Sequence, residues 1–111
     1  MERFNVGEIV ITPFPFSDLS SRKVRPAIVL AVGDHGDLIL CQITSGLNNA
    51  RNQLKLSSVS FSVGKLNQPV SYARPDKLFT CDPKMIIGKT GSLKTSVLKE
   101  IRKILIRVFD L

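Results

Sequence analysis

The chain has little of the chemistry on which many enzymes and secreted proteins depend. It contains one histidine, His35, in a turn-like Gly-Asp-His-Gly segment, so neither a histidine-based metal site nor a histidine-centred triad is expected. Its two cysteines, Cys41 and Cys81, lie far apart in apolar runs, which favours buried free thiols of a cytosolic protein. No apolar run approaches the length of a membrane span, and the N-terminus lacks a signal-peptide pattern. We therefore expect a cytoplasmic protein without a metal or other cofactor.

What the chain does have is an excess of positive charge on an ordinary globular composition. Lysine and arginine number 16 against 9 for aspartate and glutamate, which gives a formal charge of +7. Apolar residues make up 43% and charged residues 23%. We expect residues 1–111 to form one domain with a modest core. The charge favours a polyanion such as nucleic acid, or an acidic protein, although an inert basic surface would give the same count.

Short apolar runs separated by turn residues predict five to seven strands. The expected strands are about Glu8–Thr12, Ala27–Val32, Asp37–Ile43, Gln53–Leu56, a short one within Ser57–Gln68, Pro69–Ala73 and Leu78–Cys81, with Arg74-Pro75-Asp76 as an interruption. The four-residue turn that starts at Gly33 predicts a hairpin of the second and third strands. One helical turn is expected after Asp82, and Gly88 and Gly91 indicate a loop.

The C-terminal segment follows a different period. Its apolar residues have helical spacing: Val97, Leu98, Ile101, Ile104, Leu105 and Val108. The basic residues fall mostly on the other side, and Ser92, Thr95 or Ser96 is a candidate cap. Short strands followed by one amphipathic helix predict a mainly β fold. We expect a compact, strongly bent antiparallel sheet with the helix packed on or beside it.

Two arginines each precede a proline, Arg25 and Arg74, and both are expected where a loop meets a strand. Asp76 follows Arg74 by two residues, so in an extended segment both side chains face the same way. Thr44 ends the third predicted strand. Such groups suit metal-free RNA cleavage, with Asp76 as base, the arginines as cations and Thr44 as hydrogen-bond donor. An ordinary surface arginine and a local Arg74–Asp76 ion pair account for the same residues without a function.

Four segments resemble the MazF/PemK family of toxin endoribonucleases. GEIVITPFPFSDLSSRKVRPAIVL, at residues 7–30, resembles the N-terminal signature of that family, and ITSGLNNAR, at 43–51, resembles the second. YARPDKLFTCD, at 72–82, resembles the third, with its Arg-x-Asp. IIGKTGSL, at 86–93, followed by an amphipathic helix, is similar to the C-terminal end. The four segments occur in the family's order over almost the whole chain.

The resemblance implies an SH3-like barrel with a C-terminal helix, a homodimer, and metal-independent, sequence-specific cleavage of single-stranded RNA as an mRNA interferase. It implies catalytic roles for Arg25 and Thr44, and an acid–base pair of Arg74 and Asp76. The RNA contacts expected with it are Arg22, Lys23, Ser45, Asn48, Arg51 and Lys77. It further implies a cognate antitoxin with an extended, acidic tail in the RNA groove, and DNA binding together with that antitoxin.

The chain departs from the family pattern in the loop that gates the RNA groove of family members. Ser20 and Lys23 stand where many members have Glu and Gly, and Leu19 replaces a histidine of some PemK-like members. Two alternatives therefore stay open, a CcdB-like toxin that inhibits DNA gyrase and a catalytically silent nucleic-acid-binding module. The matches at Arg25 and Thr44 argue against the first, since gyrase poisoning does not need them.

Overall fold

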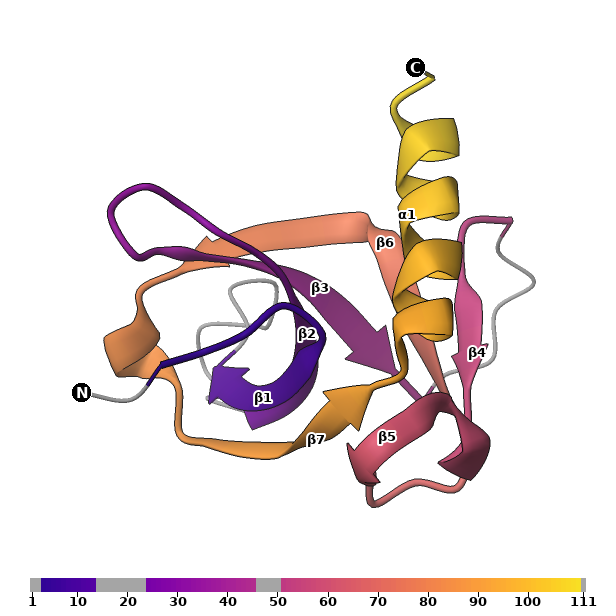
Figure 1. The fold of residues 1–111 in the computed structure, drawn as a ribbon, viewed down its shortest axis with the longest axis horizontal. Coiled ribbons are helices and arrows are strands. Elements are labelled where there is room, and N and C mark those ends of the chain that lie inside the picture. The colour runs from indigo at the N-terminus through magenta and orange to yellow at the C-terminus, as the bar shows by residue number, and fades with distance from the viewer. Residues whose placement is uncertain (1–2, 14–23, 46–50, 111) are drawn as a thin grey trace.

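The computed structural model describes residues 3–13, 24–45 and 51–110. The expectations for Leu19, Ser20, Arg22, Lys23 and Asn48 lie outside the described residues. The strands are β1 Glu8–Pro13, β2 Val24–Val32, β3 Leu38–Thr44, β4 Leu54–Leu56, β5 Phe61–Gly64, β6 Ser71–Cys81 and β7 Gly88–Leu93. The described residues also form two short 3₁₀ turns, η1 Ser58–Ser60 and η2 Pro83–Met85, and one helix, α1 Thr95–Val108 (Figure 1). The predicted mainly β fold with a C-terminal helix is confirmed.

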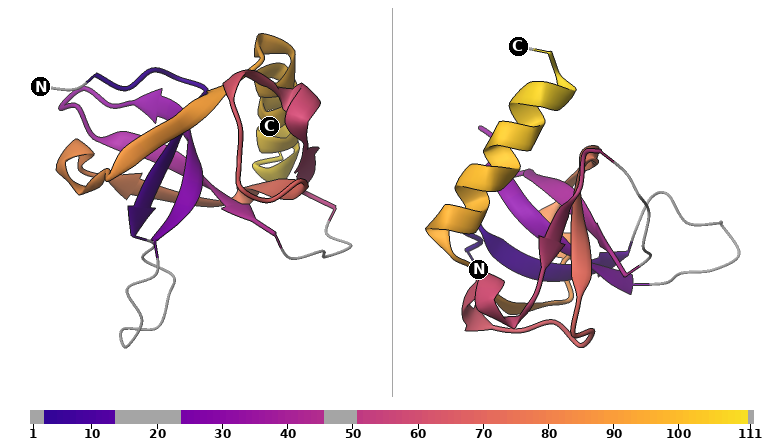
Figure 2. Two further views of the ribbon diagram at one scale, coloured as in Figure 1. Left: turned by 90° about the horizontal axis from the view of Figure 1, so that it is seen from below. Right: turned by 90° about the vertical axis from the view of Figure 1, so that its right-hand side faces the viewer.

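The strands form one antiparallel sheet in the order β4-β6-β3-β2-β1-β7-β5. The sheet curls into a half-barrel, and α1 packs against one side of it (Figures 1 and 2). The predicted hairpin of β2 and β3 is present, with Val32 paired to Leu38. Register shifts interrupt four of the strand pairings. Such bulges bend a strand and increase its twist, so they produce the strong curl.

Side chains alternate between two faces of this sheet, and each face carries a core. The helix face, which α1 covers, includes Ile9, Ile28, Cys41 and Ile43 packed with Ile101 of the helix. The opposite face carries a second cluster of fully or almost fully buried residues, Val10, Ala27, Val29, Leu38 and Leu40. Phe4, Phe79, Cys81 and Ile86 pack against the second cluster. Alternate residues of the same strands thus supply two separate cores.

The expected cap of the helix is wrong. Ser92 lies within β7, paired with Glu8, and Thr95 and Ser96 are already helical. The N-cap residue is Lys94, and no side chain caps the helix there. The backbone of Lys94 instead donates a hydrogen bond to the Ser60 carbonyl, so tertiary packing fixes the start of α1.

The expected loop at Gly88 and Gly91 is also wrong, because Gly88–Leu93 is strand β7, between β1 and β5. A Cβ atom on Gly91 would collide with the carbonyl oxygen of Val63, and one on Gly64 would collide with that of Thr90. Gly64 also has a positive φ of 74°. These glycines therefore permit a close approach of β5 and β7, which is the other common reason for glycine in a strand.

Candidate nucleic-acid interface

The candidate site is built around a bulge in β6. The β3–β6 register pairs Cys41 with Leu78 but the next residue, Gln42, with Arg74. Pro75, Asp76 and Lys77 are therefore left out of the ladder with β3. Pro75 is fully buried in this bulge, where its missing N–H costs no ladder hydrogen bond. The expected interruption at Arg74-Pro75-Asp76 is a bulge inside a continuous strand, not a break between two strands.

The bulge holds Arg74 and Asp76 in an ion pair. Nη2 of Arg74 donates to Oδ2 of Asp76 at 3.1 Å, and the two side chains are 19% and 32% exposed. Arg74 and Asp76 therefore lie close together, as their two-residue spacing predicts. Partial exposure leaves both groups within reach of a ligand, whereas a pair this close to solvent contributes little stability by itself.

Arg25, Thr44 and Arg74 lie on the same face of the sheet, opposite the helix. Directly opposed residues in neighbouring strands share a face, and Ala27, Gln42 and Arg74 form such a row across β2, β3 and β6. Arg25 lies two residues before Ala27 in β2, and Thr44 lies two residues after Gln42 in β3, so both side chains project from the same face as this row. We call Arg25, Gln42, Thr44, Tyr72 and Arg74 the polar edge. All five are partly exposed.

Two members of the polar edge escaped sequence reasoning, Gln42 and Tyr72. Each lies two residues before a predicted site residue, so counting with the period of a strand would have found both. Oε1 of Gln42 and Nε of Arg74 are buried and have no hydrogen-bond partner among the described protein atoms. Gln42 and Arg74 are directly opposite each other in β3 and β6, so both unpaired groups belong to the polar edge.

Both cysteines, Cys41 and Cys81, are free thiols. Cys41 is buried on the helix face, as predicted. Burial raises the pKa of the Cys41 thiol to about 12, although a hydrogen bond with the Arg74 backbone acts in the other direction. The thiol is therefore protonated, and not nucleophilic, at neutral pH. Cys81 is free but only half-buried, so the expectation of a buried thiol is wrong there because Cys81 packs at the margin of the second cluster.

The predicted RNA contacts that the structure describes, Ser45, Arg51 and Lys77, differ in exposure and in their neighbours. Ser45 is exposed directly after Thr44, and Lys77 is half-buried in the bulge. Arg51 is exposed ahead of β4, and its carbonyl accepts a hydrogen bond from Nη2 of Arg107 at 2.9 Å. The structure therefore places Ser45 and Lys77 beside predicted catalytic residues, whereas the backbone of Arg51 is tied to the helix.

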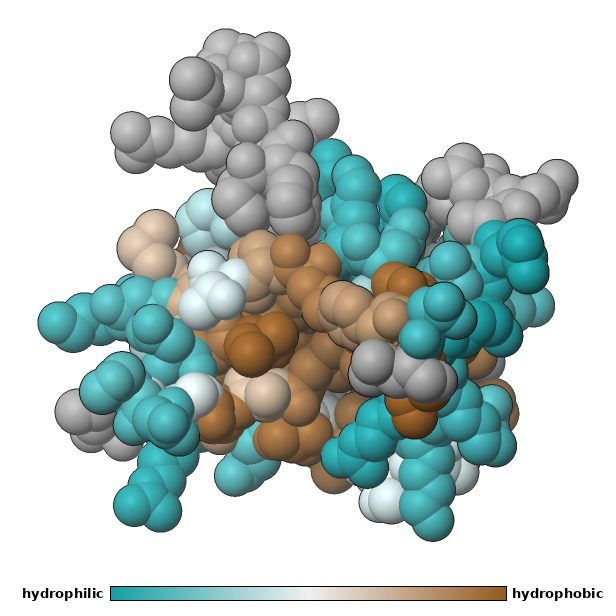
Figure 3. Space-filling view, turned by 90° about the horizontal axis from the view of Figure 1, so that it is seen from above, coloured by the Kyte–Doolittle hydropathy of each residue, from teal (hydrophilic) through white to brown (hydrophobic). Residues whose placement is uncertain are grey.

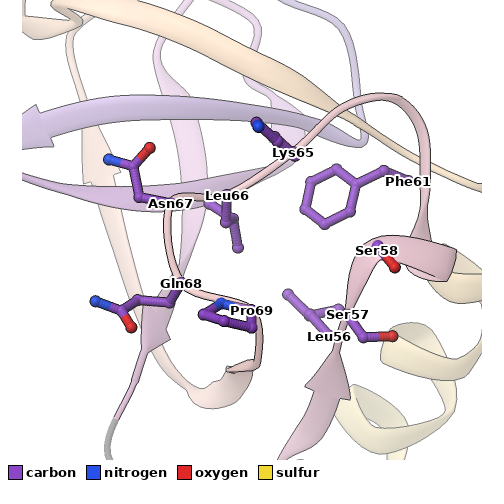
Figure 4. Close-up of a pocket in the computed structure, with 9 residues that line it drawn as sticks. All are labelled: Leu56, Ser57, Ser58, Phe61, Lys65, Leu66, Asn67, Gln68 and Pro69. Carbon is purple, nitrogen blue, oxygen red and sulfur yellow. The ribbon is translucent and has the colours of Figure 1, made fainter.

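A small pocket of about 170 Å³ lies elsewhere, between β4, η1 and the segment that follows β5. Leu56, Phe61, Leu66 and Pro69 surround it, and the side chains of Asn67 and Gln68 point away from it (Figure 4). No predicted site residue lines this pocket. Within the described ranges, no group of three or more His, Cys, Asp or Glu side chains is arranged to hold a metal ion. None of the helices among those residues is long and apolar enough to cross a membrane.

The fold and the polar edge together define a small curled-sheet protein with one C-terminal helix and a cationic patch on one sheet face. The chain belongs to the PemK-like, MazF-like toxins of type II toxin–antitoxin systems, because the model of that family matches residues 5–109. The recognition made from the four sequence segments is thereby confirmed.

Solved structures share the fold at low sequence identity. MazF from Deinococcus radiodurans superposes with a TM-score of 0.75 at 20% identity over 100% of both chains. The MazE–MazF structure (Form-II) from the same organism gives 0.78 at 20% identity, covering 100% of this chain and 99% of that one. The Mycobacterium tuberculosis toxin MazF-mt6 gives 0.72 at 21% identity, covering 94% and 97%. No curated protein matches the sequence significantly.

Proposed function

We propose that this toxin is a metal-independent endoribonuclease that cleaves single-stranded RNA, including mRNA, in the cytoplasm. The observation that carries the proposal is the assembly of Arg25, Thr44 and Arg74 on one sheet face, with Asp76 paired to Arg74 at 3.1 Å. Residues distant in sequence thus supply two cations, a hydroxyl and a carboxylate at one edge. The proposal takes residues 1–111 as one domain.

The proposed reaction uses the RNA as its own nucleophile. Asp76 accepts the proton of a 2′-OH, and the resulting 2′-oxygen attacks the adjacent phosphorus. The bond from phosphorus to the 5′-oxygen breaks, that oxygen takes up a proton from water, and Asp76 returns the proton it accepted to water. Arg25 and Arg74 stabilise the negative charge that develops on the phosphate oxygens, and Thr44 donates a hydrogen bond to them. The products carry a 2′,3′-cyclic phosphate and a 5′-OH.

Cleavage of a single-stranded oligonucleotide by purified protein tests this proposal. We expect cleavage to persist in EDTA, with a cyclic phosphate on one product and a 5′-OH on the other. Activity that EDTA abolishes and Mg²⁺ restores would refute the mechanism. RNA binding without cleavage would favour a silent binding module, and inhibition of gyrase without cleavage would favour a CcdB-like toxin.

The same proposal includes an antitoxin as partner. The relatives include MazE–MazF structures from Deinococcus radiodurans and a mycobacterial endoribonuclease solved in complex with its cognate antitoxin. The formal charge of +7 suits an acidic, extended tail that competes with RNA for the polar edge. We expect an antitoxin encoded beside this protein to bind it and inhibit cleavage. Together the two would bind DNA.

We also propose a homodimer that uses the part of the helix face that α1 leaves uncovered. Ala31 pairs with Ile39, and Leu78 is opposite Cys41, so these side chains lie on that face. Leu78, together with Leu105 of the helix, packs against its core. Figure 3 looks onto this side and shows a continuous apolar area. Ile39 remains 37% exposed there. An apolar area on a small protein is typical of a protein interface.

Light scattering at micromolar concentration tests the dimer. Ile39→Glu should shift the protein toward monomer, because a charge would be buried without a partner. Val59→Glu is the control, since Val59 is 71% exposed in η1. A wild-type protein that is monomeric throughout this range would contradict the proposed dimer.

A further inference from the structure

Tyr72 occupies a position on the polar edge to which the proposed reaction gives no role. In β6 it precedes Ala73, which is buried in the core of the helix face, so the Tyr72 ring projects from the opposite face. Arg74, two residues on, projects from that same face. Tyr72 belongs to neither apolar cluster and is half-buried. A tyrosine that served only to fill a core would be expected within one of the clusters.

The neighbours of Tyr72 across the sheet are polar on both sides. It is directly opposite Thr44 of β3 and directly opposite Lys55 of β4. Lys55 is exposed, because its neighbours Leu54 and Leu56 turn toward the helix face and Lys55 turns away from it. One row across three strands therefore presents a hydroxyl, an aromatic ring and a cation. The next row contains Arg74.

We propose that Tyr72 and Lys55 form a nucleotide subsite, in which one base of the single-stranded RNA stacks on the tyrosine ring and Lys55 binds a neighbouring phosphate. This inference rests on the proposed function, since the subsite adjoins Thr44 and Arg74. Unpaired bases commonly stack on aromatic side chains that project from a sheet. Lys55 across the sheet and Arg74 two residues along β6 place two cations near the ring, which favours a phosphate-bearing strand over an apolar peptide.

The composition of the chain provides a direct probe. It has one tyrosine and no tryptophan, so the intrinsic fluorescence of the protein reports on Tyr72 alone. An oligonucleotide with 2′-O-methyl groups binds without being cleaved, because it lacks the nucleophile. We expect it to quench the emission saturably, after correction for RNA absorbance with free tyrosine. The midpoint of quenching should match the Kd measured independently by anisotropy.

Variants separate stacking from charge. Tyr72→Phe should keep the affinity within about twofold, whereas Tyr72→Leu should lose about tenfold or more, the range of one base–aromatic stack. Lys55→Gln should reduce the slope of log Kd against log salt by about 0.7, the value for one phosphate contact with single-stranded nucleic acid. The matched control is Lys99→Gln, an equal change of charge at an exposed position on α1, which should leave the slope unchanged. Thermal melts check that each variant is folded.

These experiments also separate failure of the Tyr72–Lys55 subsite from failure of the endoribonuclease proposal. RNA that is bound and cleaved without quenching, or with unchanged affinity for Tyr72→Leu, would overturn the subsite and leave the endoribonuclease proposal intact. Quenching by an acidic peptide but not by RNA would overturn it in favour of an antitoxin contact. A wild-type protein that neither binds nor cleaves RNA would overturn both proposals.

Discussion

The two ends of the face opposite the helix are built from the same strands but differ in what covers them. At one end Val29, Leu38 and Leu40 are at most 1% exposed. At the other end Arg25, Thr44 and Arg74 continue the same alternation and are partly exposed. Phe4 and Ile86 pack over the apolar end. The position of a side chain on a face is therefore a local property, whereas its burial depends on the segments that fold over that face.

β6 contributes to both ends, and its bulge separates them. Phe79 and Cys81, after the bulge, pack against the apolar cluster. Tyr72 and Arg74, before it, belong to the polar edge. The extra residues Pro75, Asp76 and Lys77 let the strand change direction and bring a carboxylate to Arg74. If the two ends act separately, substitutions at the apolar end should change stability and substitutions at the polar edge should change RNA cleavage.

Asp76→Asn should have the largest effect, a loss of RNA cleavage with little change in stability. Loss of a general base typically lowers the rate by roughly 10³-fold. Since the Arg74–Asp76 pair is partly exposed, the free energy of unfolding should change by less than about 1 kcal/mol. Cleavage rates and denaturant unfolding of the same preparation measure both. An unchanged rate would remove Asp76 from the mechanism and leave the local ion pair as its only role.

Leu40→Ala, at the apolar end, should lower stability and leave RNA binding unchanged. Leu40 is fully buried, so removing its side chain should lower the free energy of unfolding by about 3 kcal/mol. Well below the unfolding transition, RNA affinity should stay the same, because Leu40 is buried in the apolar cluster and exposes no group to a ligand. Comparable losses of stability and affinity would show that the two ends are coupled.

Arg25→Ala should lower the cleavage rate by about 10²-fold, the usual result of removing one charge-stabilising donor. Arg25 is only partly buried at the start of β2, so the variant should fold. Single-turnover rates at saturating RNA measure the chemical step. Val24→Ala, at an exposed neighbouring position, is the control and should cleave normally.

The smallest effect expected near neutral pH concerns the Cys41 thiol on the helix face. Burial raises the pKa of Cys41 from 9.0 to about 12, so the folded protein retains the thiol proton longer than the unfolded chain does. This contribution to stability is complete below pH 9.0 and is lost as the pH rises through the folded value. Unfolding free energies of wild type and Cys41→Ala should therefore differ in their alkaline slope. Parallel curves would contradict the expectation.

The strands, the β2–β3 hairpin and the helix were predictable because the spacing of apolar residues within each short segment indicates its secondary structure. Arg25 and Arg74 were found through the prolines that follow them, and Asp76 through its two-residue spacing. The failures were of another kind. Gly91 resembles a loop residue until Val63 of β5 is seen to lie against it. The N-cap residue of α1, Lys94, has no side-chain cap, and its backbone N–H donates to the Ser60 carbonyl. Neither neighbour is near in sequence.

The sequence by itself determined which side chains share a face, because alternation along a strand follows from backbone geometry, and it determined the family through four ordered segments. Only the tertiary structure decided which strands adjoin. The order β6-β3-β2 places Tyr72, Thr44 and Gln42 beside Arg74 and Arg25, and the bulge pairs Arg74 with Asp76. Strand order depends on long-range burial in two cores, and no local pattern records it.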